Sequence, residues 1–92
     1  MKQLLGRWSG KIGTISVTFR FERNATGKNI ILMDIPEQNV KGMPVVSASL
    51  NNGNLLLKTA QLEYSGKLSG NKMDGSLTPQ GQGAIPLTLT KE

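Results

Sequence analysis

The chain lacks two residue types on which many enzymes and metal sites depend. Among its 92 residues there is no cysteine and no histidine. Without cysteine there are no disulfides and no thiolate chemistry, and without both residues the usual zinc ligand sets are excluded. Ser–His and Cys–His nucleophile systems are excluded within the chain for the same reason.

The remaining polar residues show no catalytic pattern either. Nothing in the sequence pairs two of the six acidic residues as a glycosidase requires, and no calcium-loop motif is present. Ser69 and Lys72 fit an S-x-x-K pattern, but Gly70-Asn71 between them predicts an ordinary turn. We therefore expect no catalytic, metal or cofactor site: by itself the chain is predicted not to be an enzyme, although it can form part of a hydrolase polypeptide.

Aromatic residues and long apolar runs are also scarce. The aromatics are Trp8, Phe19, Phe21 and Tyr64, and hydrophobic residues make up 37% of the chain. A chain of this length forms one domain, here residues 1–92, with a modest core of Leu, Ile, Val and Met. A core this thin often relies on a second copy or a neighbouring domain.

No run approaches the ~20 apolar residues of a membrane helix, and residues 1–6 do not resemble a signal peptide. Either the protein is not exported, or a signal was removed before this chain begins.

The positive charge is dispersed. The net charge of +5 suggests nucleic acid as a partner. The lysines, however, are spread almost evenly and mostly lie beside predicted turns, a placement typical of solubilised β-strand edges. Nucleic-acid binding on an OB-like barrel also needs exposed aromatics, whereas Phe19 and Phe21 share an apolar face. We therefore predict no nucleic-acid partner and keep the OB-like binder as the least favoured alternative.

The hydrophobic pattern has a period of two. In residues 14–23, Ile15, Val17, Phe19 and Phe21 alternate with polar residues, as in a half-buried strand. Residues 85–90 repeat this pattern, with Pro86 indicating an edge, a bulge or a barrel seam. Turn signals separate further strands, predicted at residues 28–35, 43–50, 54–59, 62–69 and 72–78, and Asn51-Asn52-Gly53 is the best hairpin signal.

These strands predict an all-β fold. About eight strands with turns every ~8–12 residues favour a small antiparallel meander barrel, with a β-sandwich as the alternative. The longest irregular connection is predicted at residues 36–42. Trp8-Ser9-Gly10-Lys11-Ile12 is echoed by Tyr64-Ser65-Gly66-Lys67-Leu68, in which each glycine leaves space for the aromatic ring on the same face. The echo indicates either pseudo-symmetry or, as we favour, a packing need shared by two strands.

Gly6-Arg7-Trp8 at the head of the meander resembles the G-x-W motif of lipocalin-like and avidin-like (streptavidin-like) barrels. The resemblance implies that Trp8 closes the base of the barrel. It also implies that a basic residue late in the last strand packs across the ring, and Lys91 is the candidate.

A second resemblance covers nearly the whole chain. In order, it rests on Trp8-Ser9-Gly10-Lys11-Ile12, Asp34-x-Pro36-x-Gln38, Gly42-x-Pro44-Val45, Tyr64-x-Gly66-x-Leu68, Gly75, Gln80-Gly81 and Pro86-Leu87-x-Leu89. This order is similar to the small all-β domain that precedes α/β-hydrolase, esterase-like domains in exported bacterial enzymes. The chain departs from that pattern at Asn39, where a glycine is common, and at Leu77-Thr78, where a Trp often follows Thr. The resemblance implies a non-catalytic accessory role and a periplasmic or secreted location, because the triad of those enzymes lies in the hydrolase domain.

The stretch from Asp34 to Pro44 is the main candidate for a binding surface. Prolines stiffen it at both ends, and stiffened loops at a barrel mouth often bind ligands. Asp34 either contacts a ligand or accepts backbone N–H bonds in the following turn. Met33 and Met43 either line a cavity or interface or fill gaps in the core. The candidate ligand or interface residues are Trp8, Met33, Asp34, Gln38, Met43, Tyr64 and Gln80.

Three functions follow from these observations, in order of preference. The first is a non-catalytic accessory barrel module of a bacterial serine hydrolase, which shapes substrate access or packs on the catalytic domain. The second is a free-standing, lipocalin-like binder of small apolar ligands, which requires a cavity inside the barrel. The third is the OB-like nucleic-acid binder. The expected partners are the hydrolase domain of the same polypeptide or a second copy of the chain, with a small apolar ligand as the alternative.

Overall fold

The computed structural model describes residues 4–92 as one antiparallel meander of strands. The strands are β1 (Gly6–Ile12), β2 (Ile15–Arg23), β3 (Asn29–Ile35), β4 (Val40–Pro44), β5 (Ser47–Asn51), β6 (Asn54–Lys58), β7 (Leu62–Ser69), β8 (Lys72–Pro79) and β9 (Ile85–Lys91), and a short 3₁₀-helix, η2 (Pro36–Gln38), precedes β4. The strands pair in the order β4-β3-β2-β1-β9-β8-β7-β6-β5. The sheet therefore has β4 and β5 as its two edges.

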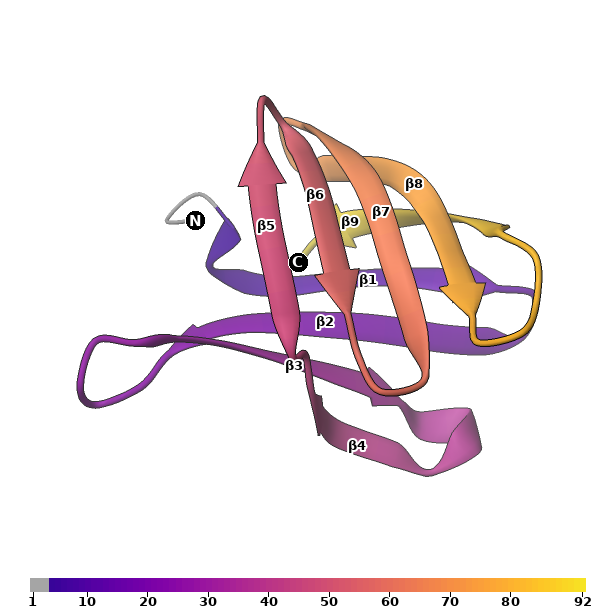
Figure 1. The fold of residues 1–92 in the computed structure, drawn as a ribbon, viewed down its shortest axis with the longest axis horizontal. Coiled ribbons are helices and arrows are strands. Elements are labelled where there is room, and N and C mark those ends of the chain that lie inside the picture. Colours follow the sequence, from indigo (N-terminus) through magenta and orange to yellow (C-terminus); the bar gives the residue numbers. More distant parts are fainter. Residues whose placement is uncertain (1–3) are drawn as a thin grey trace.

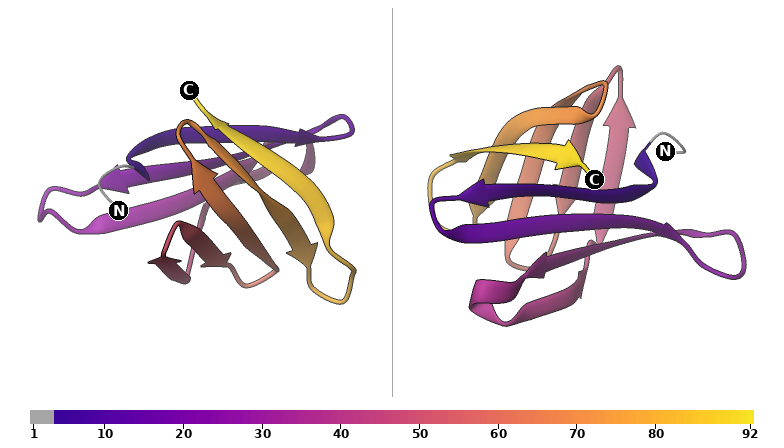
Figure 2. Two further views of the ribbon diagram at one scale, coloured as in Figure 1. Left: turned by 90° about the horizontal axis from the view of Figure 1, so that it is seen from above. Right: turned by 180° about the vertical axis from the view of Figure 1, so that it is seen from behind.

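The sheet is curled into a half-barrel. In Figure 1, β5–β8 lie across the layer formed by β1–β3, and Figure 2 shows β9 beside β1 at the back, where the two layers join. The all-β, barrel-like fold class predicted from the alternating pattern is confirmed. The Cα radius of gyration is 12.3 Å, close to the ~12 Å expected for a globular domain of this length. The half-barrel is thus as compact as an ordinary domain.

The structure has nine strands instead of about eight, because the strand predicted at residues 43–50 is divided. The Val45 N–H donates to the Ile31 carbonyl on β3 (2.9 Å), whereas the Val46 N–H donates to the Lys58 carbonyl on β6 (2.8 Å). The chain therefore changes layers between these two residues. Pro44, which has no N–H to donate, ends β4 just before the crossing.

The predicted irregular connection at residues 36–42 is shorter than expected. Pro36 occupies the first turn of η2, and Asn39 ends it in the left-handed conformation (φ 59°), which Asn tolerates better than most residues. Strand β4 then begins at Val40. The register between β3 and β4 shifts between Met33 and Ile35, so an extra residue is accommodated here as in a β-bulge.

The core lies between the two layers. On β2, Val17, Phe19 and Phe21 are buried, as their alternation predicts. The Phe19 ring meets the ring of Tyr64 on β7, with centroids 5.6 Å apart. This contact joins the middle of one layer to the middle of the other.

The two glycines of the sequence echo are required for different reasons. A Cβ on Gly66 would lie 2.7 Å from the Tyr64 hydroxyl oxygen, so this glycine leaves space for the ring as predicted. A Cβ on Gly10 would instead lie 2.2 Å from the Thr88 carbonyl oxygen. The expectation that Gly10 makes room for the Trp8 ring is therefore wrong, because the close neighbour of Gly10 is the backbone of β9.

Candidate functional site

Toward the start of β1, which we call the closed end, the interior of the half-barrel is filled by Trp8, the partner of Phe19 across β1 and β2. The Trp8 ring is fully buried, and its Nε1–H donates to the Leu4 carbonyl (2.9 Å). The Lys91 Nζ lies 5.9 Å from the ring centroid, within the range of a cation–π contact. The packing of Lys91 on Trp8 that was expected from the G-x-W resemblance is thus present.

Two further candidates, Met33 and Tyr64, lie in the middle of the core with no exposed surface. The Tyr64 hydroxyl is placed to donate to the carbonyls of Met73 (3.2 Å) and Leu87 (3.1 Å). Burial raises the pKa of this hydroxyl well above its ordinary value of 10.0. Tyr64 therefore stays neutral and ties β7 to β8 and β9, while Trp8, Met33 and Tyr64 together fill the interior.

The opposite end of the half-barrel is not filled. A cavity of about 320 Å³ opens there, where β1, β3 and β8 end and β2, β7 and β9 begin. Its lining is mostly apolar and comes from both layers: Ile12, Ile15, Val17, Ile35, Val40, Leu62, Leu77, Pro79 and Ile85, together with Gln38, Gln61 and Gln82. The three glutamines are exposed and supply the side-chain amide groups of the lining.

The rim of this cavity is held by polar contacts from η2 and the β8–β9 loop. The Glu37 carboxylate accepts the Ser16 N–H (2.9 Å), which fixes η2 against the start of β2. This hydrogen bond lowers the pKa of Glu37 below its ordinary value. The Gln80 N–H donates to the Gln61 carbonyl (2.8 Å), which joins two loops of the rim.

The remaining candidate ligand or interface residues do not gather at the cavity. Gln38 lines it, whereas Gln80 is exposed beside a separate depression over the β6–β7 and β8–β9 loops. Met43 is half-buried, pairs with Met33 across β3 and β4, and packs against the core. Asp34 lies on the outer face of the sheet. Of the seven candidates, Gln38 alone reaches the cavity.

Asp34 organises the outer face of β2–β4. It accepts hydrogen bonds from Arg20 Nε (2.7 Å) and Nη2 (3.2 Å) and from the Gly42 N–H (2.7 Å). Burial alone raises the pKa of Asp34, but the bonds from Arg20 and Gly42 outweigh it and hold the pKa below its ordinary value. Asp34 therefore accepts a backbone N–H, as one of its two predicted roles required, but the donor, Gly42, lies on β4 and not in the turn that follows Asp34.

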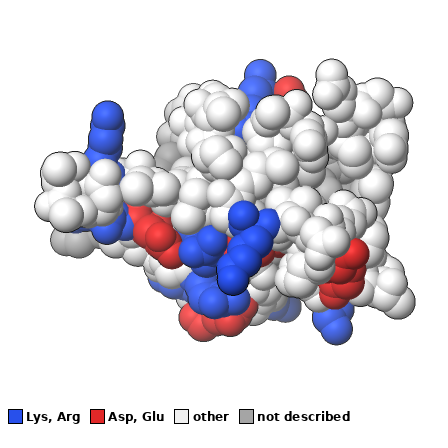
Figure 3. Space-filling model, turned by 90° about the horizontal axis from the view of Figure 1, so that it is seen from below, with Lys and Arg blue, Asp and Glu red and all other residues white. Residues whose placement is uncertain are grey.

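Beside Asp34 the surface forms a second cavity, of about 600 Å³. We call it the basic hollow; it is lined by Arg7, Thr18, Arg20, Asp34, Pro36, Asn39, Val40 and Lys41. In Figure 3, Lys and Arg side chains gather near the centre of the visible face, with acidic side chains beside them. No sequence motif marks this site, because Arg7 and Arg20 become neighbours only through the register of β1 and β2.

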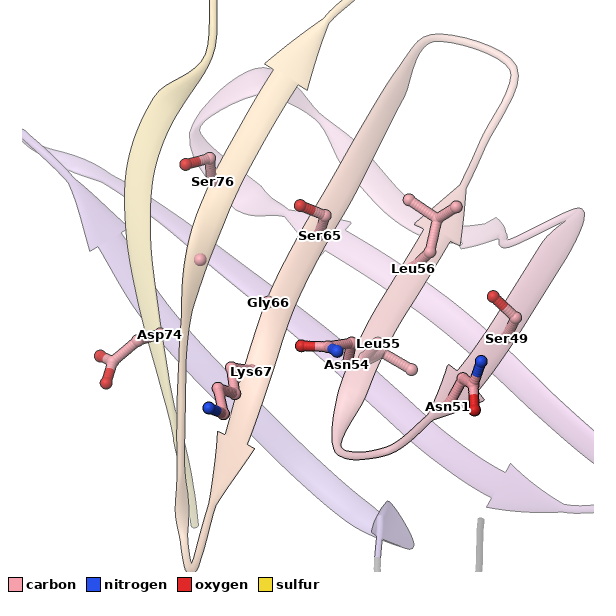
Figure 4. Close-up of a pocket in the computed structure, with 11 residues that line it drawn as sticks. Ser49, Asn51, Asn54, Leu55, Leu56, Ser65, Gly66, Lys67, Asp74 and Ser76 are labelled. Atoms are coloured by element: carbon pink, nitrogen blue, oxygen red, sulfur yellow. The ribbon is translucent and has the colours of Figure 1, made fainter.

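A third depression lies on the outer face of β5–β8. Figure 4 shows its short polar side chains, among them Ser49, Ser65 and Ser76, around Leu56. They come from adjacent strands in register, since Leu56 pairs with both Ser49 and Ser65. Asp74 at its margin accepts the Thr88 hydroxyl (3.1 Å). This polar face resembles the solvated side of an ordinary sheet.

Comparison with protein-family models and with curated proteins finds no match for this chain. Within residues 4–92, no group of three or more acidic residues lies close enough together to hold a metal ion. Nor does this part of the chain contain a helix long and apolar enough to cross a membrane.

Proposed function

We propose that this chain is a non-catalytic binding module whose site is the cavity at the open end of the half-barrel. The observation that carries the proposal is the contrast between an apolar wall and an amide-bearing rim. A volume of about 320 Å³ lies at the lower end of the range typical of small-molecule sites. A short apolar chain or ring fits such a wall, and its polar end would hydrogen-bond with Gln38, Gln61 or Gln82.

The context proposed for this module is a bacterial serine hydrolase. Support comes from the order of motifs along the chain, several of which have structural roles here: Trp8 closes one end, Asp34 binds Gly42, and Gly66 makes room for Tyr64. In this context the cavity would accept an apolar group of the substrate or of the catalytic domain. The alternative, a free-standing binder of small apolar ligands, is favoured by the cavity itself.

Binding of a neutral hydrophobic dye tests the proposed site. Nile red is suitable because it carries no charge and is not attracted to the basic hollow. We expect saturable binding by the folded protein and displacement by decanol. Leu62→Trp places a larger side chain in the cavity wall and should abolish binding. Leu56→Trp, on the outer face of β6, is the matched control and should leave it unchanged.

Two outcomes would contradict the proposed site. One is the absence of Nile red binding to protein whose denaturation is cooperative, and the other is equal loss of binding in both variants. The proposed context needs a separate measurement, the mass of the natural polypeptide on an immunoblot. A band larger by at least one catalytic domain, on the order of 100–200 residues, supports the accessory module, whereas a band near the 9.9 kDa of this chain favours the free-standing binder.

A further inference from the structure

Two arginines stand directly opposite each other on the outer face of the sheet. Arg7 on β1 pairs with Arg20 on β2 in the antiparallel register. Like charges at directly opposite positions destabilise a sheet. The arrangement therefore needs either compensating anions or a function that uses two adjacent guanidinium groups.

Neighbouring carboxylates compensate the positive charges of the two arginines only in part. Arg20 is held by Asp34 through two hydrogen bonds and contacts Glu22 through Nη1 (3.2 Å). Arg7 has a longer contact, 3.7 Å from its Nε to Glu92, and its side chain is 59% exposed. Exposed pairs of this kind contribute little to stability, so Arg7 keeps most of its capacity to bind another anion.

Lys41 adds a third positive charge to the same hollow. It lies on β4, on the far side of Asp34 from Arg7, and is exposed. No ion pair within residues 4–92 involves it. The residues that line the hollow thus carry three positive charges and one negative charge, while Glu22 and Glu92 lie outside the lining. The lining residues alone have a net charge of +2, and the carboxylates of Glu22 and Glu92, which contact Arg20 and Arg7, offset that charge until an anion displaces them.

We infer that the basic hollow binds a phosphate or sulfate group of a small molecule, held by Arg7, Arg20 and Lys41. Such a group carries a charge of about −1.5 to −2 near neutral pH and would take the place of Glu22 and Glu92 as the anionic partner of the two arginines. The planar fork of a guanidinium group suits a tetrahedral oxyanion. Asp34 takes the Nε–Nη2 edge of Arg20 and Glu22 contacts Nη1, so Asp34 fixes the guanidinium plane and a ligand would bind the remaining Nη N–H groups. The hollow shares Val40 with the apolar cavity, but its charged side chains do not line that cavity, and the inference does not depend on the function proposed for the cavity.

Titration with inorganic phosphate, followed by NMR at constant ionic strength with chloride as the reference salt, tests this inference. We expect saturable shifts of the Arg20 Nε–H and of the Gly42 N–H, because both donate to the Asp34 carboxylate beside the hollow. Sulfate should compete for the same site. Shifts that do not saturate, or equal shifts with chloride, would overturn the inference.

Charge-removing variants make the test specific. Arg7→Gln and Lys41→Gln should each weaken phosphate binding about tenfold, as expected for the loss of one charge-assisted hydrogen bond. Lys67→Gln, on β7 in the opposite layer, removes the same charge and should leave binding unchanged. Equal weakening in all three variants would indicate nonspecific attraction to the net charge and contradict a site in the hollow.

A variant of Glu22, which lies outside the lining of the basic hollow, should strengthen phosphate binding instead of weakening it. Glu22 competes with an incoming anion for Arg20 Nη1, so Glu22→Gln should tighten phosphate binding several-fold. Thermal denaturation of the same variant separates this effect from misfolding, because tighter binding requires a folded site. Unchanged or weaker binding by a folded Glu22→Gln protein would count against Arg20 as a ligand.

Discussion

The two ends of the half-barrel are built in opposite ways. At one end a large ring, Trp8, is fully buried, hydrogen-bonded to Leu4 and packed against Lys91. At the other end Ile12, Ile15 and other medium-sized aliphatic residues surround a cavity of about 320 Å³. The chain uses its scarce aromatic residues for the closed end and the centre and leaves the other end to side chains too small to fill it.

This difference separates the end whose packing stabilises the fold from the end whose cavity is available for binding. In a chain of 92 residues the core is small, and an unfilled volume loses packing contacts that the fold would otherwise gain. An occupant of the kind proposed above would restore part of these contacts at the cavity.

The closed end should show the largest effect. Trp8→Ala removes a large, fully buried ring and a hydrogen bond, so we expect a loss of about 3–5 kcal/mol in the free energy of unfolding, enough to unfold much of a marginally stable domain. Urea denaturation measures it. Ile85→Ala, at the half-buried wall of the open end, is the comparison and should cost less. Equal losses would remove the contrast between the two ends.

The close approach of β7 and β8 should show the next largest effect on the free energy of unfolding. A Cβ on Gly75 would lie 2.0 Å from the Ser65 carbonyl oxygen, so Gly75→Ala must displace backbone and should cost about 1–3 kcal/mol. Gly83→Ala is the control, because its Cβ meets nothing within 4 Å. Chemical denaturation of both variants should show a loss for Gly75→Ala alone, and a silent Gly75→Ala would contradict the close approach of the two strands.

The carboxylate of Asp34, on the outer face of β2–β4, should make the free energy of unfolding depend on pH. The pKa of Asp34 is lower in the folded protein than its ordinary value of 3.8. Its contribution is therefore complete at pH values above 3.8 and is lost as the pH falls through the folded pKa. Glu37 adds a contribution of the same sign, because its pKa is also lowered.

Asp34→Asn should lower stability at neutral pH and flatten this acid dependence. Thermal denaturation between neutral and acidic pH measures both effects. Glu63→Gln, which removes a carboxylate in an exposed ion pair with Lys58 (3.6 Å), is the control and should leave the profile nearly unchanged. An Asp34→Asn profile identical to the wild type would refute the role of the Arg20–Asp34–Gly42 contacts.

The open end should give the smallest change in stability. Val40→Leu adds one methylene to the cavity wall, where the larger side chain has free volume to occupy. Its effect on the free energy of unfolding should stay within about 0.5 kcal/mol, while the affinity for Nile red falls. A loss as large as that expected from overpacking a filled core, about 1–3 kcal/mol, would mean that the cavity is not available.

Local features of the fold were predictable from sequence, whereas features that depend on register were not. Alternation along residues 15–23 identified β2, and Asn52 and Gly53 adopt the positive φ values (53° and 81°) that their turn requires. The division of residues 43–50 at Val45 and Val46 depends on which layer each N–H reaches, which no local pattern encodes.

The candidate sites divide in the same way. Trp8 and Lys91 were linked by the resemblance of Gly6-Arg7-Trp8 to the G-x-W motif, and the Lys91 Nζ lies 5.9 Å from the centroid of the Trp8 ring. Asp34 was identified as part of the proline-stiffened stretch from Asp34 to Pro44. The cavity was not predictable, because its lining comes from residues scattered between positions 12 and 85. The pairing of Arg7 with Arg20 likewise follows from the register of β1 and β2.

The central claim is that the open end binds an apolar group and the closed end does not. The most direct measurement is a methyl NMR titration of the folded protein with decanol. The account predicts saturable shifts of the methyl groups of Ile12, Ile35 and Leu62 around the cavity, with little change at Met33 and Met73 in the filled core. Shifts spread over both groups, or none at the cavity, would contradict it.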